Sequence, residues 1–482
     1  MFFIFLPIFC MGQKQGNIWY FGDHAGLDFN NVSPVALTNG ETYSPDGTKV
    51  EGTAVISDSS GSLLFYTNGM KIWNKNQQVM PNGDNLLGDF SSTQSALIVP
   101  QPNSSRYFYV FTTDCFQNNL QNGFRYSVVD ICLNNGMGDV IPNQKNIKLI
   151  DTVSEKLTAV RHANGMDYWI IVHKYYSDAF YSYHLSAAGI VDTVISHIGS
   201  RHPNIATNQT PDEAIGELKA SPNGNKIAIV TGNSAPYAIA EYFNFDKNTG
   251  LLSNWVNLQT NTALQQQYYY GVCFSPDNSK LYITSIININ DVYQFDLNAG
   301  GGNADSVSAS ITNIATNNYY YYYGLQLGTD GKIYLARSNT QYLSAINNPN
   351  NTGANCNFQD SAIYLNGEIC GYGLPNFIDS YDYANTIFKC QEVDVTEENL
   401  NEKISISPNP CASQTIIHTD KVFNDAILDV YNSLGQQVKQ IKNIFGSTII
   451  LYRDNLLNGV YFIRLTQNNK VITTNKLIIM DN

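Results

Sequence analysis

Three stretches of the sequence repeat one pattern: GELKASPNGNKIAIV (216–230), GVCFSPDNSKLYITS (271–285) and GLQLGTDGKIYLARS (324–338). Each has a glycine, a short apolar run, a turn made of Asn or Asp with Gly or Asn, and a lysine that leads into a second apolar run. Asn-Gly or Asp-Gly between alternating apolar runs is a strong signal for a β-hairpin. The three copies begin 55 and then 53 residues apart, so the pattern predicts a repeated structural unit of that size.

Weaker copies of the hairpin pattern lie upstream, at residues 52–69, 95–114 and 158–174. Most hairpins are followed by a third strand pattern, as in FYSYHLSAAG (180–189) and EYFNFDKNTG (241–250). Helical periodicity is almost absent. Antiparallel units of three or four strands, repeated around an axis, are typical of a β-propeller. The six hairpin units therefore predict six blades.

A seventh blade is predicted from the two ends of the repeat region. GYGLPNFID (371–379) looks like a first strand without a partner, and NIWYFGDHAGLDFN (17–30) looks like a second and a third strand without a first. Joining the two would close the ring and protect the sheet edges. We therefore predict an all-β protein with a seven-bladed β-propeller at residues 13–390, closed by its N- and C-terminal strands.

Tyrosines cluster where the innermost strands are expected to begin. Five consecutive tyrosines (319–323) precede Gly324, Tyr268–Tyr270 precede Gly271, and Tyr372 lies between two glycines. Equivalent positions in neighbouring blades meet at one end of the central channel. Two interpretations stay open. The rings pack between blades with their hydroxyls at the wet rim, or they form a ring of aromatic faces that stacks on sugars or other flat ligands.

The second interpretation gives a candidate ligand-binding site made of Tyr268, Tyr270, Tyr319, Tyr321, Tyr323 and Tyr372. Under it, replacing Tyr319, Tyr321 and Tyr323 with alanine should abolish ligand binding and leave the fold intact. Loss of the thermal transition in that variant would instead mean that the tyrosines are structural.

The composition points to an exported protein without a nucleic-acid partner. The formal net charge is −13, only 14% of residues are charged, and no run of Lys or Arg occurs, whereas phosphate binding needs clustered positive charge.

Residues 2–10 are almost wholly apolar. That length is too short for a membrane span but is typical of the core of a signal peptide, which we place at residues 1–12. No other segment predicts a transmembrane helix.

Export makes disulfides possible among the cysteines that remain after Cys10 is removed with the signal peptide. Proximity in the sequence predicts two pairs, Cys115–Cys132 and Cys356–Cys370, and allows a third, Cys390–Cys411. The alternative is that all are free thiols, because sequence does not fix connectivity. Cys273 lies in a buried strand pattern and is expected to be a free core thiol.

The pattern changes after residue 390. QEVDVTEENLNEK (391–403) is polar, with five acidic residues, and is typical of an acidic linker. Residues 404–482 alternate short apolar strands with Gly and Asn turns, which predicts a small β-sandwich.

This tail resembles the type A C-terminal sorting domain of type IX secretion, which Bacteroidetes use. The matching residues are Pro408, Asn409 and Pro410, Gly435 in VYNSLGQQV, Gly459 in LLNGVYFIRL, and Lys476 in the last strand. The resemblance implies handling by the type IX secretion machinery and removal of the tail by a sortase-like peptidase. It also implies a secreted or cell-surface location outside the outer membrane, with release or attachment to surface lipopolysaccharide.

The body of the chain resembles the WD-repeat-like propellers that often precede such tails. The matching stretches are NIWYFGDHAGLDFN, STQSALIVP, EKLTAVRHANGMDYWIIVH and GLPNF. That family has no settled activity, so the resemblance implies a fold and a location and adds no mechanism.

A search for catalytic patterns finds no HExxH, GxSxG, P-loop or GxGxxG, and we predict no catalytic residue, metal site or cofactor. His162, His173 and His184 could ligate a metal if they converged. Equal spacing on antiparallel strands does not by itself bring them together, so we favour partly buried strand histidines. Glu51, Glu155 and Glu217 lie near innermost strands and could act as a glycosidase pair if suitably spaced. Hydrogen-bonded strand ends are the alternative.

The sequence as a whole favours a non-enzymatic binding or adhesion module for a glycan or a surface protein. The alternative is a polysaccharide-active hydrolase or lyase that uses channel carboxylates. A scaffold for gliding or envelope assembly is a third interpretation. A convergent carboxylate pair in the channel would favour the enzyme, and a flat aromatic rim without one would favour binding.

Overall fold

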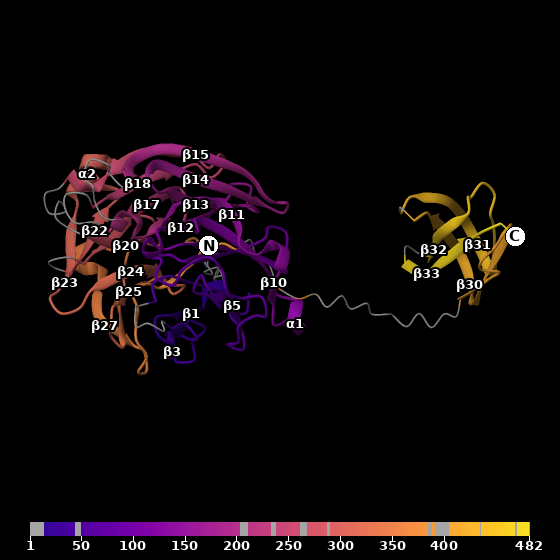
Figure 1. Ribbon diagram of the computed structural model, residues 1–482, viewed down its shortest axis with the longest axis horizontal. Coiled ribbons are helices and arrows are strands. Elements are labelled where there is room, and N and C mark those ends of the chain that lie inside the picture. The colour runs from indigo at the N-terminus through magenta and orange to yellow at the C-terminus, as the bar shows by residue number, and fades with distance from the viewer. Residues whose placement is uncertain are drawn as a thin grey trace, which may run out of the picture. The chain divides into compact units, whose positions relative to one another are not determined.

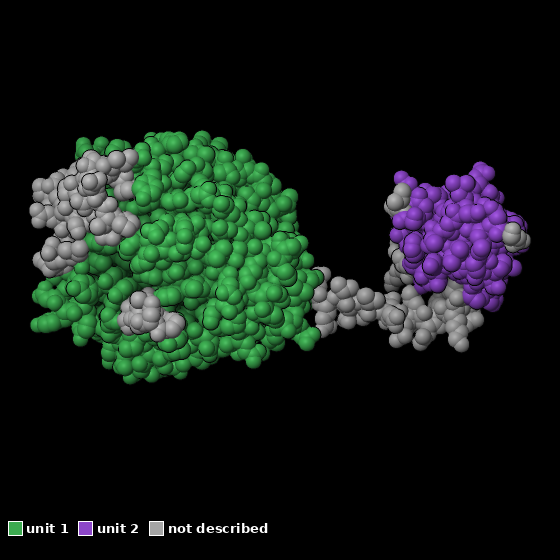
Figure 2. Space-filling view, viewed as in Figure 1, with its two compact units in different colours: residues 1–390 green, residues 391–482 purple. Residues whose placement is uncertain are grey.

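The structure is a computed structural model, and it describes residues 14–43, 50–202, 211–232, 238–260, 268–286, 290–383, 388, 390, 404–433, 435–467 and 470–481. The chain divides into two compact units, Met1–Cys390 and Gln391–Asn482 (Figure 2). The predicted signal peptide (1–12) and acidic linker (391–403) lie outside the described residues.

The first unit is an all-β, seven-bladed propeller, which confirms the predicted fold class (Figure 1). Its innermost strands lie next to one another in sequence order around the ring. Blade 1 contains β4 (Thr53–Ser57), β5 (Leu63–Thr67) and β6 (Ile72–Asn74), and blade 2 contains β7 (Ala96–Pro100), β8 (Tyr107–Thr113), β9 (Phe124–Asp130), β10 (Asp139–Val140) and β11 (Ile147–Ile150). Blade 3 contains β12 (Val153–Arg161), β13 (Tyr168–Lys174), β14 (Ser177–Ser186) and β15 (Gly189–His202), and blade 4 contains β16 (Leu218–Ala220), β17 (Lys226–Val230), β18 (Ala240–Phe245) and β19 (Leu252–Asn257). Blade 5 contains β20 (Tyr269–Phe274), β21 (Lys280–Ser285), β22 (Asn290–Asp296) and β23 (Thr312–Asn317), and blade 6 contains β24 (Tyr322–Leu327), β25 (Ile333–Arg337), β26 (Tyr342–Ile346) and β27 (Phe358–Tyr364).

Blade 7 uses the beginning of the chain, with β1 (Ile18–Phe21), β2 (Ala25–Asp28) and β3 (Val35–Leu37). Figure 1 shows these indigo strands beside the orange strands of blade 6, and side chains of β1, β25 and β26 share one buried cluster. The helical elements described are short: α1 (Leu133–Gly136), α2 (Ala304–Ala309), η1 (Lys14–Gly16), η2 (Phe116–Asn118), η3 (Pro142–Gln144), η5 (Pro211–Ala214), η6 (Leu258–Thr260), η8 (Ala299–Gly301) and η9 (Gly353–Cys356).

The repeated turn residues close the hairpins as their sequence predicts. In blade 4, Ser221 N donates to Lys226 O (2.9 Å) and Lys226 N donates to Ser221 Oγ (2.9 Å). In blade 5, Ser275 N donates to Lys280 O (2.9 Å) and Lys280 N donates to Ser275 Oγ (2.8 Å). The same local chemistry therefore fixes the same turn in successive blades, which is why the repeat could be recognised from the sequence.

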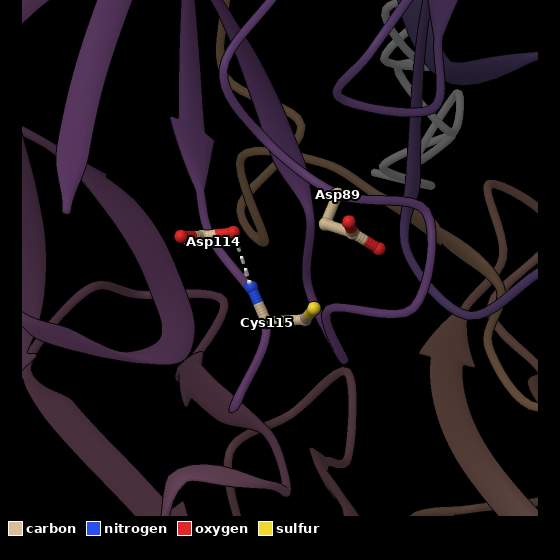
Figure 3. Close-up of side chains that lie close together, drawn as sticks. All are labelled: Asp89, Asp114 and Cys115. Carbon is tan, nitrogen blue, oxygen red and sulfur yellow. Dashed lines mark hydrogen bonds between the residues drawn. The ribbon is translucent and has the colours of Figure 1, made fainter. Parts of the chain in front are cut away.

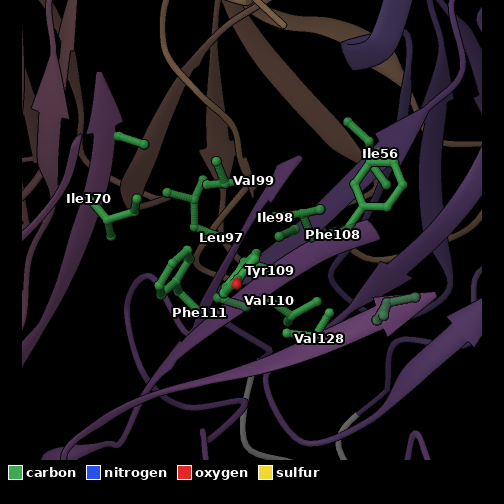
Figure 4. Close-up of a cluster of buried hydrophobic side chains, with 14 of the residues drawn as sticks. Ile56, Leu97, Ile98, Val99, Phe108, Tyr109, Val110, Phe111, Val128 and Ile170 are labelled. Atoms are coloured by element: carbon green, nitrogen blue, oxygen red, sulfur yellow. The ribbon is translucent and has the colours of Figure 1, made fainter. Parts of the chain in front are cut away.

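Apolar side chains on both faces of the strands fill the spaces between blades. Figure 4 shows one such cluster, in which Ile56, Leu97, Phe108 and Val110 lie close together with Ile170. Phe65 and Phe108 meet edge to face across blades 1 and 2, with ring centroids 5.4 Å apart, as aromatic pairs prefer. Because each blade is covered by neighbours on both faces, its strands are apolar in continuous runs rather than in strict alternation.

The ring closes through the predicted segment but with a different strand partner. Gly324 N donates to Tyr372 O (2.9 Å) and Tyr372 N donates to Val50 O (3.2 Å), so this segment lies between blades 6 and 1. β28 (Pro375–Asn376), however, pairs in parallel with β4 and not with β1. The predicted pairing of residues 371–379 with residues 17–30 was wrong in this respect. Thr53 Oγ1 of β4 donates to Tyr20 O of β1 (2.9 Å), so a side-chain hydrogen bond links β1 to blade 1.

The predicted disulfides were also wrong. Cys132 is bonded to Cys390, 258 residues away, whereas Cys115, Cys273, Cys356, Cys370 and Cys411 are free and buried. Cys115 follows the end of β8 and Cys132 follows the end of β9, so a seven-residue strand separates them, about 20 Å in length. Cys356 and Cys370 are likewise separated by the seven residues of β27. Neighbours in the sequence thus lie at opposite ends of a blade.

The second unit is the small β-sandwich predicted for the tail. Its strands are β29 (Ile404–Ser407), β30 (Gln414–Tyr431), β31 (Gln437–Tyr452), β32 (Gly459–Gln467) and β33 (Lys470–Ile479). The first part of β30 pairs with β29 and the last part with β32, while β31 pairs with both parts. Buried residues from both parts, such as Ile417, Leu428 and Leu465, share one core.

Candidate functional site

Glycines allow the inner strands to approach one another closely at one end of the channel, which we call the mouth. A Cβ atom on Gly373 would lie 2.0 Å from Glu51 O, and one on Gly271 would lie 2.4 Å from Tyr323 O. No side chain fits at these positions, which explains why glycine follows the tyrosines in successive blades. The mouth therefore brings together residues far apart in the sequence, as the Tyr-Gly pattern predicts.

Tyr270, Tyr323 and Tyr372 come together at the mouth. The rings of Tyr323 and Tyr372 stack with centroids 4.2 Å apart, and Tyr270 meets Tyr323 edge to face at 4.8 Å. Tyr270 is fully buried and its hydroxyl donates to the carboxylate of Glu51. Burial raises the pKa values of all three phenols. These three side chains therefore cover the end of the channel and pack mainly on one another.

Tyr319, Tyr320 and Tyr321 are more exposed, and of these three only Tyr321 has a ring contact with the packed group, to Tyr323 at 6.0 Å. They are 86%, 41% and 48% exposed. Asn317 Oδ1 accepts hydrogen bonds from the amides of Tyr319 (2.8 Å) and Tyr320 (3.1 Å), and the guanidinium of Arg337 lies 4.0 Å from the ring centroid of Tyr320. Asn317 thus fixes the backbone at Tyr319 and Tyr320, and a cation–π contact holds the ring of Tyr320.

Tyr268 lies elsewhere. It is half-buried, and its ring packs against Gly232 of blade 4. Of the six tyrosines in the candidate site, the structure groups Tyr270, Tyr321, Tyr323 and Tyr372 in successive ring contacts, and places Tyr319 at the exposed edge. Sequence reasoning left out Tyr320, although its position within the same run was a usable signal.

The carboxylates Glu51, Glu155 and Glu217 are all buried near the mouth. Glu155 accepts hydrogen bonds from Thr93 N, Thr93 Oγ1 (both 2.9 Å) and Phe116 N (2.8 Å). Glu217 accepts hydrogen bonds from Val272 N (2.9 Å) and Leu325 N (3.4 Å), which belong to blades 5 and 6. These carboxylates therefore tie adjacent blades together.

Burial dominates the titration of these carboxylates. It raises the pKa values of Glu155 and Glu217 to about 7. Burial, followed by the charge of Glu155, raises the pKa of Glu51 well above its usual range. Carboxylic acids with such pKa values can act as general acids in principle. Here both oxygens of Glu155 and Oε2 of Glu217 accept hydrogen bonds from backbone amides, and the Tyr270 hydroxyl donates to Glu51.

Further along the channel, five polar side chains fill the axis: Gln94, Lys219, Gln326, Asn376 and Asp379, all buried. Lys219 Nζ donates to Gln326 Oε1 (2.6 Å) and to Asn376 Oδ1 (3.3 Å), and lies 3.6 Å from Asp379 Oδ1. Sequence reasoning missed this network. A lysine within an innermost strand (Lys219 in GELKAS) was the one available signal.

Three side chains of metal-ligating types meet beside the mouth, as Figure 3 shows: Asp89, Asp114 and Cys115. Asp114 already accepts hydrogen bonds from Cys115 N (3.0 Å), Asn118 Nδ2 (3.0 Å) and Asn122 N (2.8 Å). Burial raises the pKa of the Cys115 thiol to about 12, which opposes formation of the thiolate that a metal would need. The cluster organises the loop after β8.

Two of the three spaced histidines meet. His162 and His184 stack with centroids 4.8 Å apart, and His184 Nε2 lies 3.0 Å from Asp167. His173 stacks instead on His202 at 4.1 Å. His173 and His202 are buried, and neither has a hydrogen-bond partner for either ring nitrogen among the described residues.

The His173–His202 pair should make stability depend on pH. Burial lowers the pKa of His173 to about 3 and that of His202 well below its usual value, whereas an unfolded histidine takes up a proton near pH 6.5. The unfolded state therefore binds more protons than the native state below about pH 6.5. The stabilisation from the neutral rings is complete above that pH and is lost as the pH falls.

Raised carboxylate pKa values act in the opposite direction between pH 4.5 and 7, so a variant must be compared with the wild type. His173→Phe should reduce the slope of unfolding free energy against pH by up to about 1.4 kcal/mol per pH unit below pH 6. Urea denaturation between pH 4 and 7 measures it, with the exposed His197→Phe as control. Parallel curves for His173→Phe and wild type would contradict this explanation.

In the tail, the residues of the predicted sorting signal are partly brought together. Asn409 Nδ2 donates to Lys476 O (2.9 Å), and Asn409 Oδ1 accepts from Ile478 N (2.8 Å). The Pro-Asn-Pro turn is thereby fixed to the last strand. Gly435 has a φ of +78° in the turn between β30 and β31, a conformation that favours glycine. Gly459 begins β32 and pairs with Ile479.

The body of the chain thus belongs to the class of β-propellers, and the tail identifies its export route. Residues 405–480 match the secretion system C-terminal sorting domain. The protein is therefore cargo of type IX secretion, secreted or held at the cell surface. No helix among the described residues is long and apolar enough to cross a membrane.

Comparison with solved structures returns propellers with little sequence identity. Hsv2 from Kluyveromyces lactis is 9% identical, with a TM-score of 0.37, over 69% of this chain and 90% of that one. The β-propeller domain of Cps50 (Swd1) from Myceliophteria thermophila is 10% identical, with a TM-score of 0.37, over 67% and 94%. The periplasmic gluconolactonase PpgL from Pseudomonas aeruginosa is 12% identical, with a TM-score of 0.35, over 83% and 98%. Among curated proteins none matches.

Proposed function

We propose that the protein is a non-enzymatic binding or adhesion module for a glycan, exported through its sorting tail. The observation that carries this proposal is the group of exposed rings Tyr319, Tyr320 and Tyr321 beside the channel mouth. Exposed aromatic side chains in a row are unusual on a soluble surface and suit a binding role. Their ring faces carry negative potential and attract the C–H groups of a sugar face, and their hydroxyls offer hydrogen bonds.

The alternative, a polysaccharide hydrolase or lyase, would rest on Glu51, Glu155 and Glu217. What supports binding over catalysis is the use of these groups: Glu155 and Glu217 accept hydrogen bonds from the backbone of neighbouring segments, and Glu51 lies beneath Tyr270. A hydrolytic pair needs one carboxyl group that reaches the scissile oxygen and one that reaches the anomeric carbon or a water. A carboxylate whose oxygens accept hydrogen bonds from backbone amides is not free to take either of these two roles.

Tyr319→Ala/Tyr321→Ala should reduce glycan binding by at least about tenfold, because each ring face contributes on the order of 1 kcal/mol. The thermal transition should stay unchanged, since both side chains are exposed and exposed substitutions change stability little. Tyr323 is excluded from the variant because it packs on Tyr270 and Tyr372. The measurement is binding of the full chain to an array of bacterial and plant glycans.

Tyr176→Ala, which removes another exposed tyrosine in blade 3, is the matched control and should bind like the wild type. Reproducible wild-type binding to one glycan class, lost in the double variant, supports the proposal. Release of shortened products from that glycan would indicate the enzyme instead. A blank array from folded protein would count against a glycan and favour a surface protein as the ligand.

A further inference from the structure

The mouth side of blade 6 carries more tyrosines than the run that first drew attention. Its strands are antiparallel, so β24 and β26 begin on the side where β25 and β27 end. On this side, Tyr322 at the start of β24 pairs with Arg337 at the end of β25, and Tyr342 at the start of β26 pairs with Tyr364 at the end of β27. Tyr342 and Tyr364 are 37% and 48% exposed and contact each other with centroids 5.2 Å apart. Sequence reasoning had not included either residue.

The strand order β24-β25-β26-β27 places these side chains one after another from the channel outward. We call them the blade 6 stripe: Tyr321, Tyr320 over Arg337, and then the pair Tyr342 and Tyr364. Tyr321 is also in contact with Tyr323 at the channel mouth (6.0 Å), and so the stripe continues from the mouth outward. Adjacent strands are about 4.8 Å apart, and the four strands of the blade therefore cover about 14 Å. A single sugar ring cannot reach from one end of the stripe to the other.

The stripe is almost uncharged within a protein whose formal net charge is −13. Residues 317–323, 337–342 and 360–372 contain only three charged side chains, Arg337, Asp360 and Glu368. Arg337 and Asp360 lie 3.4 Å apart and neutralise each other. The remaining polar side chains are amides and hydroxyls, such as Asn339, Thr340 and Gln341. Such a surface matches a polar ligand that carries no charge of its own.

The groups beneath the stripe are fixed before any ligand arrives. Arg337, which supports Tyr320, donates to Ser361 Oγ. Thr340 Oγ1 donates to Arg337 O (2.9 Å), and Gln341 Nε2 donates to Gly367 O (3.0 Å). Preorganised side chains lose little conformational entropy on binding, which suits recognition of a repetitive polymer through several similar contacts.

From these observations we propose that blade 6 binds an uncharged polysaccharide as an extended chain, with consecutive sugar residues running from Tyr321 and Tyr320 at the mouth to Tyr342 and Tyr364 at the outer strands. The proposal rests on the proposed function and adds the chemical class of the glycan and its direction across the blade. Each added sugar residue meets a further aromatic face, so the affinity increases with chain length until the stripe is filled.

The test uses the full chain and three uncharged oligosaccharide series, β-1,4-gluco-, β-1,3-gluco- and β-1,4-manno-oligosaccharides of one to six residues, measured by calorimetry. In at least one series the affinity should rise at least about tenfold from two to six residues. Tyr342→Ala/Tyr364→Ala should remove that gain, because the loss of two aromatic faces lowers the affinity for the longer oligosaccharides about tenfold. Tyr319→Ala/Tyr321→Ala should weaken binding at every length.

Tyr342→Phe/Tyr364→Phe keeps the ring faces and should retain most of the gain, which separates loss of contact from misfolding. Oligogalacturonides of the same lengths are the charged control and should bind more weakly. The proposal is overturned if disaccharide and hexasaccharide bind equally, if the outer pair has no effect on the hexasaccharide, if the charged series binds best, or if none of the uncharged series binds. In the first three cases glycan binding near Tyr319–Tyr321 still stands, and the array with the Tyr319→Ala/Tyr321→Ala variant decides it separately.

Discussion

Lys219→Met is expected to lower the free energy of unfolding of the propeller by about 3–5 kcal/mol, because it removes one partner of a buried ion pair and leaves the other without compensation. Lys219 and Asp379 are both buried on the channel axis with 3.6 Å between Nζ and Oδ1. Gln326 and Asn376 would also lose their hydrogen bonds to the ammonium group. Burial already raises the pKa of Asp379, which means that its charged form is costly there.

Urea denaturation at pH 7 measures the effect. Lys332→Met is the matched control, because Lys332 forms a partly exposed ion pair with Asp330 at 4.0 Å and such pairs contribute less than about 1 kcal/mol. The double variant Lys219→Met/Asp379→Asn removes both charges and should recover part of the loss. If Lys219→Met costs no more than Lys332→Met, the axial network is not a major source of stability.

Replacing Cys132 and Cys390 together with alanine is expected to lower the free energy of unfolding by about 4 kcal/mol, near the upper end of the range for disulfides. The bond joins residues 258 apart, and a cross-link over so long a loop strongly restricts the unfolded chain. It also fastens the segment that follows β28. In that segment Phe388 packs on Phe108 with centroids 4.7 Å apart, and Asp379 accepts from Thr158 Oγ1 (2.8 Å).

Each single variant, Cys132→Ala or Cys390→Ala, should cost as much as the double variant because either one breaks the bond. Cys115→Ala, at a buried free thiol, is the matched control and should cost much less. Alkylation of the unfolded, unreduced protein should modify the five free cysteines of the described residues. Modification of Cys132 or Cys390 in that experiment, or equal stability of variant and wild type, would contradict the assignment.

Features that depend on local chemistry could be read from the sequence. The Ser221–Lys226 and Ser275–Lys280 turns are formed by their own residues, so the hairpins and their repeat were visible without any structure. The tail was recognisable for the same reason, since Gly435 marks a turn and the Pro-Asn-Pro motif is contiguous. Alternation and turn residues act over a few positions, and that is the range within which sequence patterns are reliable.

Features that depend on closure of the ring could not be predicted. β28 contributes two residue pairs to its ladder, and so short a segment carries no signal for one partner over another. The Cys132–Cys390 bond depends on where residue 390 lies after the chain has passed around all seven blades. The blade 6 stripe was missed because Tyr342 and Tyr364 are distant from the tyrosine run in sequence and join it only through strand register.

The closing segment also sets an order on synthesis. Blade 1 gains its parallel strand from residues 375–376, and the disulfide needs residue 390, so a nascent chain holds an open ring until nearly the whole propeller has left the ribosome. The export tag at residues 405–480 is translated only after that point. A chain that ends before residue 375 therefore lacks both the closing strand and the sorting domain. Because the sorting domain follows the propeller in the chain, a truncated chain that lacks part of the propeller also lacks the domain that the secretion machinery recognises.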